Sequence, residues 1–360
     1  MTTKHLKSIS TAKKVAFFIC CLCIISVIVF DKILLEISIF REGWPTFSIG
    51  DLMRSTIIFI STIGIFYSMV GIQKPIFLIS ERKGASFELA SIIMVLFISV
   101  ITLSLFMFNP STFNKLSKED NVIEWGSAIL LFGSFLFTGL TMLNYHRSSN
   151  NLSFVKLFIG LMSLAFFIIF MEEVSWFQRV LEVKTPESFG SNVQDEMNLH
   201  NFATEFTEYA YYLGAFVFLV IFPFFRFIFP TISSNDFLKI IAPRPFIGII
   251  GSISCSYNFD MWNNIFIQIS FFSSLVILSL FTIFSINRFD RNITLFTLFL
   301  ITNNQILFLT FGENFDRLWE ITEYKELFIP FGFFIYSIDL YLNVKHYIIP
   351  RQDFSPNYNS

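Results

Sequence analysis

Long apolar runs alternate with short polar connectors along almost the whole chain. A helix needs roughly 20 residues to cross about 30 Å of hydrocarbon, and an apolar run of that length is typical of a membrane span. Such runs cover residues 14–37, 56–72, 89–108, 123–143, 154–180, 206–229, 264–286, 294–311 and 327–348. The pattern predicts an all-α, polytopic bundle of membrane-spanning helices.

A further apolar run, residues 238–255, is interrupted by Pro243 and Pro245. Proline breaks a regular helix, and irregular backbone is tolerated at membrane depth only where protein or a water-filled cavity surrounds it. The segment is therefore expected either to span in a broken form or to be a re-entrant or interfacial piece. If it spans, the bundle has about ten crossings and both termini lie on the same side.

Basic residues in the short connectors predict the orientation, because lysine and arginine are enriched in cytoplasmic loops. With the N-terminus in the cytoplasm, most of the 25 basic residues lie on the cytoplasmic side and most of the 27 carboxylates at the other side. No small-x-small step follows the first apolar run, so we expect an uncleaved first span. The chain is expected to be one integral membrane domain, 1–360, with a cytoplasmic segment at 1–13, an extracytoplasmic loop at 181–205 and a disordered tail at 350–360.

Composition agrees with this architecture. Hydrophobic residues make up 54% of the chain and charged residues 14%, and the mean hydropathy of +0.64 exceeds that of a soluble domain. A net charge of -2 gives no indication of nucleic-acid binding, and the four cysteines lack the CxxC spacing of a metal site. We expect a multi-pass protein of the bacterial cytoplasmic (inner) membrane, with the lipid bilayer as its surroundings.

One polar stretch, residues 171–201, carries the densest set of chemically active groups. If its first part is helical, Glu172, Trp176 and Arg179 share one face, and Glu173 lies on the next strip. These glutamates fall near the outer edge of the hydrocarbon, where an unpaired charge is costly, so they should be paired, protonated or bound to a ligand. Alternatively, Arg179 simply neutralises a nearby glutamate, and Trp176 belongs to the interfacial aromatic belt.

Polar side chains then recur at every second position, which places them on one side of an extended segment. This row consists of Asn192, Gln194, Glu196, Asn198 and His200, and Asn201 follows it. Folded over the membrane mouth, the row would face the glutamate pair, and carboxylates with one imidazole could bind a divalent metal or act as acid and base. A solvated loop whose amides satisfy turns is the alternative.

Two other polar groups are predicted on the same side of the membrane. One runs from Glu205 to Tyr212, and the other begins at the amides Asn303 to Gln305, which need partners inside the hydrocarbon. The second group continues to Glu320 and Glu323, which could instead be ordinary helix-start charges. With the stretch 171–201, these groups make a predicted three-part site.

The polar stretch resembles a family of poorly characterised bacterial multipass membrane proteins. The family signature E-E-x-S-W-x-Q-R, T-P-E and N-x-Q-x-E-x-N-x-H-N matches residues 172–179, 185–187 and 192–201, with Asp195 as an extra charge. The resemblance implies no established reaction. The chain is also similar in composition and length to O-antigen polymerases, although those proteins typically have a larger extracytoplasmic loop.

The leading hypothesis is a membrane-embedded enzyme acting on a lipid or lipid-linked substrate at the extracytoplasmic leaflet. The rival hypothesis is a transporter or proton-coupled or cation-coupled carrier, and a third is a structural assembly factor. The enzyme hypothesis assigns catalysis or metal ligation to Glu172, Glu173, Glu196 and His200. It assigns substrate binding to Arg179, Trp176, Gln178, Asn192, Gln194, Asn198, Asn201, Glu320 and Glu323.

Overall fold

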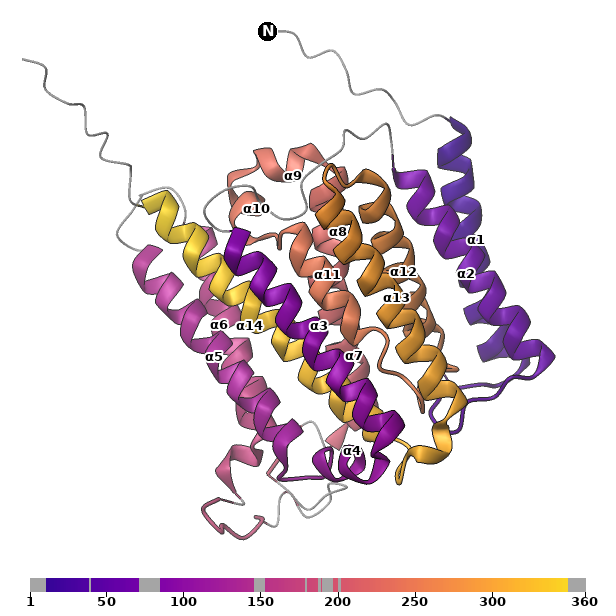
Figure 1. Cartoon of the computed structure of the whole chain (residues 1–360), viewed down its shortest axis with the longest axis horizontal. Helices are drawn as coiled ribbons and strands as arrows, with labels where there is room; N and C mark the ends of the chain where they lie inside the picture. The colour runs from indigo at the N-terminus through magenta and orange to yellow at the C-terminus, as the bar shows by residue number, and fades with distance from the viewer. Residues whose placement is uncertain are drawn as a thin grey trace, which may run out of the picture.

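The fold was analysed in a computed structural model, which describes residues 11–38, 40–70, 85–145, 153–178, 180–186, 189, 197–199 and 202–348. Within these ranges the chain forms helices and connectors and no strand, which confirms the predicted all-α bundle. Figure 1 shows the long helices side by side, with the start of α1 and the end of α14 at the same end of the bundle.

The first half of the bundle comprises α1 (Thr11–Leu34), α2 (Ile49–Met69), α3 (Ala85–Phe108), α4 (Pro110–Leu116), α5 (Val122–Tyr145) and α6 (Ser153–Glu173). The second half comprises α7 (Thr204–Phe216), the π-turn η4 (Val217–Ile221), α8 (Phe222–Ile228), α9 (Pro230–Ser234), α10 (Asp236–Ile241), α11 (Pro245–Ser254), α12 (Ile265–Phe284), α13 (Arg288–Thr310) and α14 (Glu320–Ile348). Short turns η1 (Ser175–Phe177) and η5 (Gly312–Asn314) follow α6 and α13.

Nine helical segments in the described part of the chain are long and apolar enough to cross a membrane, one for each uninterrupted run predicted above. Their outward faces are strongly apolar. In α1, which packs mainly on α2 at the edge of the bundle (Figure 1), Phe18 and Leu22 are more than half exposed. Such faces are stable only against lipid, so the fold is that of a multi-pass membrane protein.

The proline-interrupted run is not one helix. It divides into α10, a break before Pro245, and the ten-residue helix α11, and it continues as a non-helical segment, residues 255–264. Arg244 lies beside Glu88 at the start of α3, whereas Asn263 bonds Thr46 in the connector between α1 and α2. These contacts lie at opposite ends of the bundle, so residues 244–264 form the tenth crossing, half helical and half irregular.

Two names follow from this arrangement. The outer end is the end that carries the described connector residues 35–38 and 40–48 and the described motif residues 174–178 and 197–199, and it is the predicted extracytoplasmic side. The inner end is the end that carries the start of α1 and Arg244. Residues 248–264 are buried throughout, so protein surrounds the irregular segment on all sides, as membrane depth requires.

The close packing of the tenth crossing depends on Gly251. A Cβ atom at this position would lie 2.8 Å from the carbonyl oxygen of Leu219 in the π-turn η4. Only glycine therefore lets α11 approach the backbone of η4 so closely. A π-turn opposite an interrupted span is a combination that recurs at functional sites.

Helix α6 ends at Glu173, which corrects the predicted run to residue 180. Ser175, Trp176 and Phe177 all have positive φ angles, of 47°, 53° and 60°, so the chain makes one left-handed turn there. Left-handed geometry costs roughly 1–2 kcal/mol per non-glycine residue, so the surrounding contacts must hold this turn in place. The shared helical face predicted for Glu172 and Trp176 does not exist as such, although the turn brings the two side chains together.

Candidate functional site

The described part of the polar stretch is a hydrogen-bonded unit. Glu172 accepts two bonds of 2.8 Å, one from the indole Nε1 of Trp176 and one from the backbone N–H of Leu199. Because both carboxylate oxygens are used, Glu172 connects the end of α6 to residues 197–199. The contact with Trp176 is made across the left-handed turn, and not along the helical face that sequence spacing predicts.

Four further motif side chains continue this unit. Gln178 donates to Thr185 Oγ1 at 2.7 Å and accepts from the backbone N–H of Met197 at 2.6 Å. Asn198 donates to Ser175 Oγ at 3.0 Å, and both Gln178 and Asn198 are buried. The predicted substrate-binding residues Trp176, Gln178 and Asn198 therefore hold the loop against α6.

Changing Glu172 to glutamine is expected to loosen this unit. A glutamine can accept one of the two N–H bonds, but its own N–H₂ group would face the other donor, and the net loss is about 1–3 kcal/mol for the bonds to a charged group. Limited proteolysis in detergent should cleave the loop 181–205 faster in the Glu172→Gln protein. Glu182→Gln, an exposed change in the same loop, is the control, and equal cleavage of both variants would contradict the assignment.

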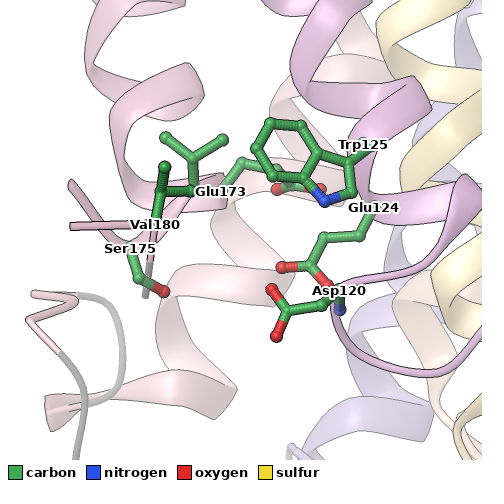
Figure 2. Close-up of a pocket in the computed structure, with 7 residues that line it drawn as sticks. Asp120, Glu124, Trp125, Glu173, Ser175 and Val180 are labelled. Atoms are coloured by element: carbon green, nitrogen blue, oxygen red, sulfur yellow. Dashed lines mark hydrogen bonds between the residues drawn. The ribbon is translucent and has the colours of Figure 1, made fainter. Parts of the chain in front are cut away.

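Glu173 points away from Glu172. It accepts a hydrogen bond from Ser127 on α5 and lines an opening with Asp120, Glu124 and Trp125. Figure 2 shows the carboxylates of these residues gathered around that opening. The exposed side chain of Val180 forms another part of its rim, so the opening lies at the surface of the outer end.

Behind this opening lie more carboxylates, contributed by α7 and α14. Glu173 interacts electrostatically with Glu326 and Glu323, and Glu326 interacts with Glu208 on α7. The hydroxyl of Tyr212 donates a hydrogen bond to Glu326. All four glutamates are half-buried, and Glu173 is the one among them that lines the opening.

Lys325 is the cation placed next to these acids. It is 3% exposed, donates to Asn258 Oδ1, and lies 4.7 Å from the centre of the Tyr212 ring. It also interacts electrostatically with Asp260, Glu326 and Glu208. We name Glu173, Glu208, Asp260, Glu323 and Glu326 the carboxylate cluster, with Lys325 beside it.

The irregular segment 255–264 holds this lysine through a paired amide contact. Asn258 donates to Gln305 Oε1 at 2.9 Å, and Gln305 donates to the backbone carbonyl of Asn258 at 2.7 Å. Asp260 accepts from Thr322 at 3.1 Å. The amide orientation of Asn258 is fixed in this way, and its Oδ1 faces Lys325.

The predicted amides of α13 do find partners inside the bundle. Asn304 donates to Ser99 at 3.1 Å, and Asn303 donates to a carbonyl of its own helix, Phe299 O, at 2.7 Å. Gln305 bonds the irregular segment, so the amides of Asn304 and Gln305 support the tenth crossing. The sequence predicts instead that they face the motif loop.

Glu320 and Glu323 make different contacts. Glu320 is fully buried and accepts a bond from the backbone N–H of Asp316 at 2.8 Å, with Arg317 3.4 Å away. These contacts are those of a residue that stabilises a helix start. Glu323 instead belongs to the carboxylate cluster, where it interacts with Glu326 and Glu173.

Several predicted site residues lie outside the described ranges. They are Arg179, Asn192, Gln194, Glu196, His200 and Asn201. Among the residues that are described, no group of three histidine, cysteine or acidic side chains is arranged to hold a metal ion. The predicted divalent-metal site, which needs Glu196 and His200, therefore stays a prediction.

Asp260, Lys325 and Asn258 were not singled out from the sequence. Lys325 lies among the charges at the start of α14, which suggested a solvated helix end. The signal that could have located Asp260 and Asn258 is the polar run SYNFDMWNN directly after the proline-interrupted apolar segment.

No family model matches the chain, and no curated protein or solved structure is similar to it. The case for a function therefore depends on the site alone.

Proposed function

We propose that this protein is a proton-coupled membrane carrier whose proton-binding groups are the carboxylate cluster. The observation that carries this proposal is the charge balance of the site. Five carboxylates from α6, α7, α14 and the irregular segment repel one another, whereas Lys325 interacts with only three of them, Asp260, Glu208 and Glu326, and Arg317 interacts with Glu323. Carboxylates this close together cannot all stay ionised, because like charges in a poorly solvated site repel strongly.

The arrangement of these groups supports transport. Titratable side chains extend from the surface opening at Asp120 and Glu124, through Glu173, to Glu326 and Lys325. Chains of acidic residues inside a membrane bundle are typical of proton relays. The interrupted tenth crossing ends this path, and broken spans mark the ion and substrate sites of many carriers.

The site also draws on both halves of the chain. The opening is lined by α5 and α6, whereas Lys325, Asp260 and Glu208 come from the second half. Residues of both halves therefore contribute to one connected set of charges. Relative movement of the halves would then expose the same carboxylates to each end in turn.

Proton binding can be measured without knowledge of the transported substrate. Purified protein would be reconstituted into liposomes and adsorbed on a solid-supported membrane, and a pH jump applied. The wild-type protein should give a transient current as protons enter the cluster, and Glu326→Gln should reduce the displaced charge at least about twofold, because one strongly interacting carboxylate is removed. Glu182→Gln is the exposed control and should match wild type. A folded wild-type protein that gives no protein-dependent current would refute the proposal.

A membrane-embedded enzyme acting on a lipid or lipid-linked substrate is the second candidate. The exposed opening lined by Glu173, Glu124 and Trp125 favours it, because paired carboxylates at a membrane surface can serve as acid and base. Mass spectrometry of the lipids of cells that produce wild-type or Glu173→Gln protein tests this candidate. A lipid species that accumulates only with the variant would support an enzyme, and identical lipid profiles together with pH-jump currents would support the carrier.

A further inference from the structure

Residues 40–46, in the connector between α1 and α2, lie across the outer end of the irregular segment. We name these residues the strap. Gly43 N–H donates to the carbonyl of Asp260 at 3.0 Å, and the ring of Trp44 packs edge-on against Phe259 at 5.3 Å. The strap therefore covers the backbone of the segment that carries Asp260.

The strap also contacts α7. The ring of Phe40 lies 5.1 Å from that of Tyr209, whose hydroxyl donates to the carbonyl of Arg41 at 3.4 Å. Because Glu208 precedes Tyr209, the strap connects the two elements that contribute Glu208 and Asp260 to the carboxylate cluster.

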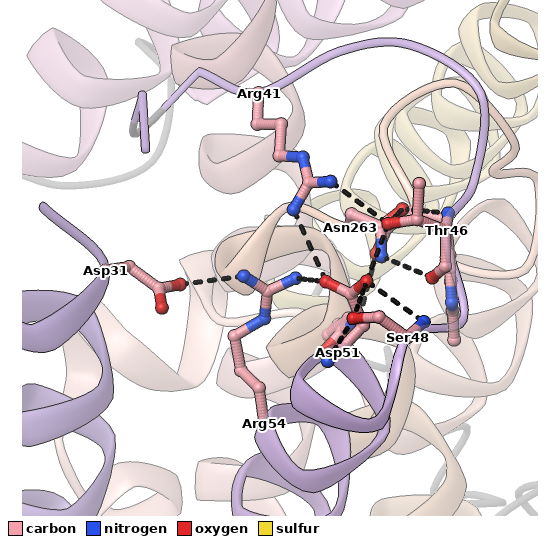
Figure 3. A network of polar contacts seen from close by, with 9 residues as sticks. Asp31, Arg41, Thr46, Ser48, Asp51, Arg54 and Asn263 are labelled. Atoms are coloured by element: carbon pink, nitrogen blue, oxygen red, sulfur yellow. Dashed lines mark hydrogen bonds and ion pairs between the residues drawn. The ribbon is translucent and has the colours of Figure 1, made fainter. Parts of the chain in front are cut away.

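One end of the strap is firmly anchored. Thr46 exchanges two backbone bonds with the side chain of Asn263, of 2.7 and 3.0 Å, and Ser48 and Asp51 form a capping box at the start of α2. Figure 3 shows these groups together with the arginines that hold Asp51. Arg54 bonds Asp51 at 2.7 Å and Asp31 at 2.9 Å, so the anchor reaches back to α1.

The middle of the strap is built differently. Gly43 has φ +136°, a conformation open to glycine and strained for other residues, and a Cβ there would meet no atom within 4 Å. A glycine in open space beside a rigid anchor is suited to act as a hinge.

Glu42 precedes this glycine and faces several acids. Asp260 of the irregular segment and Glu205 and Glu208 of α7 all act on it. Partial desolvation, and then the charges of Asp260 and Glu205, raise the pKa of Glu42 to about 7. Lys325 acts on Asp260 and Glu208. Arg41 is engaged by Thr46 at 3.0 Å and by Asp51. Tyr209 is the other titratable group that faces Glu42.

We infer that the strap is a lid that closes over the outer end of the tenth crossing when Glu42 is protonated and opens when Glu42 loses its proton. The raised pKa means that the docked strap binds a proton more tightly than a released strap does. Docking is therefore favoured below pH about 7, and it weakens as the pH rises from about 4.5 through 7, as ionised Glu42 is repelled by the acids beneath it.

Thiol labelling beneath the strap tests this inference. The four native cysteines would be replaced by serine, and Met261, which is buried and follows the strap-bonded Asp260, would be changed to cysteine. The labelling rate with a membrane-impermeant maleimide would be measured from pH 5.5 to 8 in proteoliposomes, with and without Glu42→Gln. The ratio of the two rates cancels the ionisation of the thiol itself.

We expect this ratio to rise at least about tenfold between pH 5.5 and pH 8, because ionisation of Glu42 releases the strap whereas glutamine keeps it docked. Glu36→Gln, an exposed change in the same connector, should label like the parent protein. A ratio near 1 at every pH, or no labelling of the parent at any pH, would overturn the inference. Thermal unfolding of each variant establishes that it is folded. Labelling needs no transport, so a negative result here is distinct from failure of the carrier proposal.

Discussion

Lys325→Met is expected to lower the free energy of unfolding by about 3–5 kcal/mol, among the largest effects of any single substitution in this chain. The lysine is buried, and it is the cation that faces Asp260, Glu208 and Glu326 from within the bundle. Methionine has a similar length, so the change leaves little cavity. What it leaves is a set of acids without their counter-ion. Denaturant titration in detergent, followed by tryptophan fluorescence, measures the loss.

A second substitution separates charge from packing. Asp260→Asn removes the most buried acid of the carboxylate cluster and keeps its size. Added to Lys325→Met, it should restore at least about 1–2 kcal/mol, because the two side chains interact and their effects are not additive. The stability loss caused by Asp260→Asn alone is measured as well. If the double variant loses the sum of the two single effects, the lysine is not the counter-ion of Asp260.

Arg244→Met is expected to be nearly as damaging at the inner end. The guanidinium of Arg244 bonds Asp339 on α14, with Nε at 2.9 Å from Oδ2, and also bonds Glu88 at the start of α3. Both carboxylates are almost completely buried, at 5% and 1% exposure of the side chain. Removing one partner of a buried ion pair costs about 3–5 kcal/mol, because the other charge remains buried.

The matched control for Arg244 is Arg291→Met, which removes an exposed arginine near the start of α13. Surface charges contribute about 0–1 kcal/mol, so this control should unfold close to wild type. Both variants would be compared by thermal unfolding of the purified protein. Equal midpoints would show that the Arg244 contacts do not connect α3, α11 and α14.

The membrane bundle could be predicted from the sequence because each uninterrupted apolar run is long enough to span, and hydropathy alone identifies such runs. The tenth crossing could be predicted only as an alternative. Helix α11 has ten residues, which is too few to span, and the second half of the crossing, residues 255–264, has the composition of a loop. What makes that half stable in the membrane is its contact with Gln305 and Lys325, partners far away in the chain.

The candidate site shows the same limit. Glu172 and Glu173 were predicted to act together, but neighbouring residues on a helix point about 100° apart. The structure accordingly directs Glu172 to the motif loop and Glu173 to the carboxylate cluster. The hydrogen bond of Glu172 with Trp176 depends on the left-handed turn after Glu173, which helical spacing does not predict. Burial of Lys325 depends on how α7 and the irregular segment pack around it, which local sequence does not encode.

The irregular tenth crossing has a consequence for biogenesis. A segment that carries Asn258, Asp260 and Asn263 is a poor substrate for independent insertion, since a single aspartate at the centre of a helix costs about 2.5–3.5 kcal/mol when the translocon releases it into lipid. Its stabilising partners, Gln305 and Lys325, are synthesised only later, with α13 and α14. Residues 245–264 should therefore wait in a protected position until these helices emerge, and the bundle should close around them last.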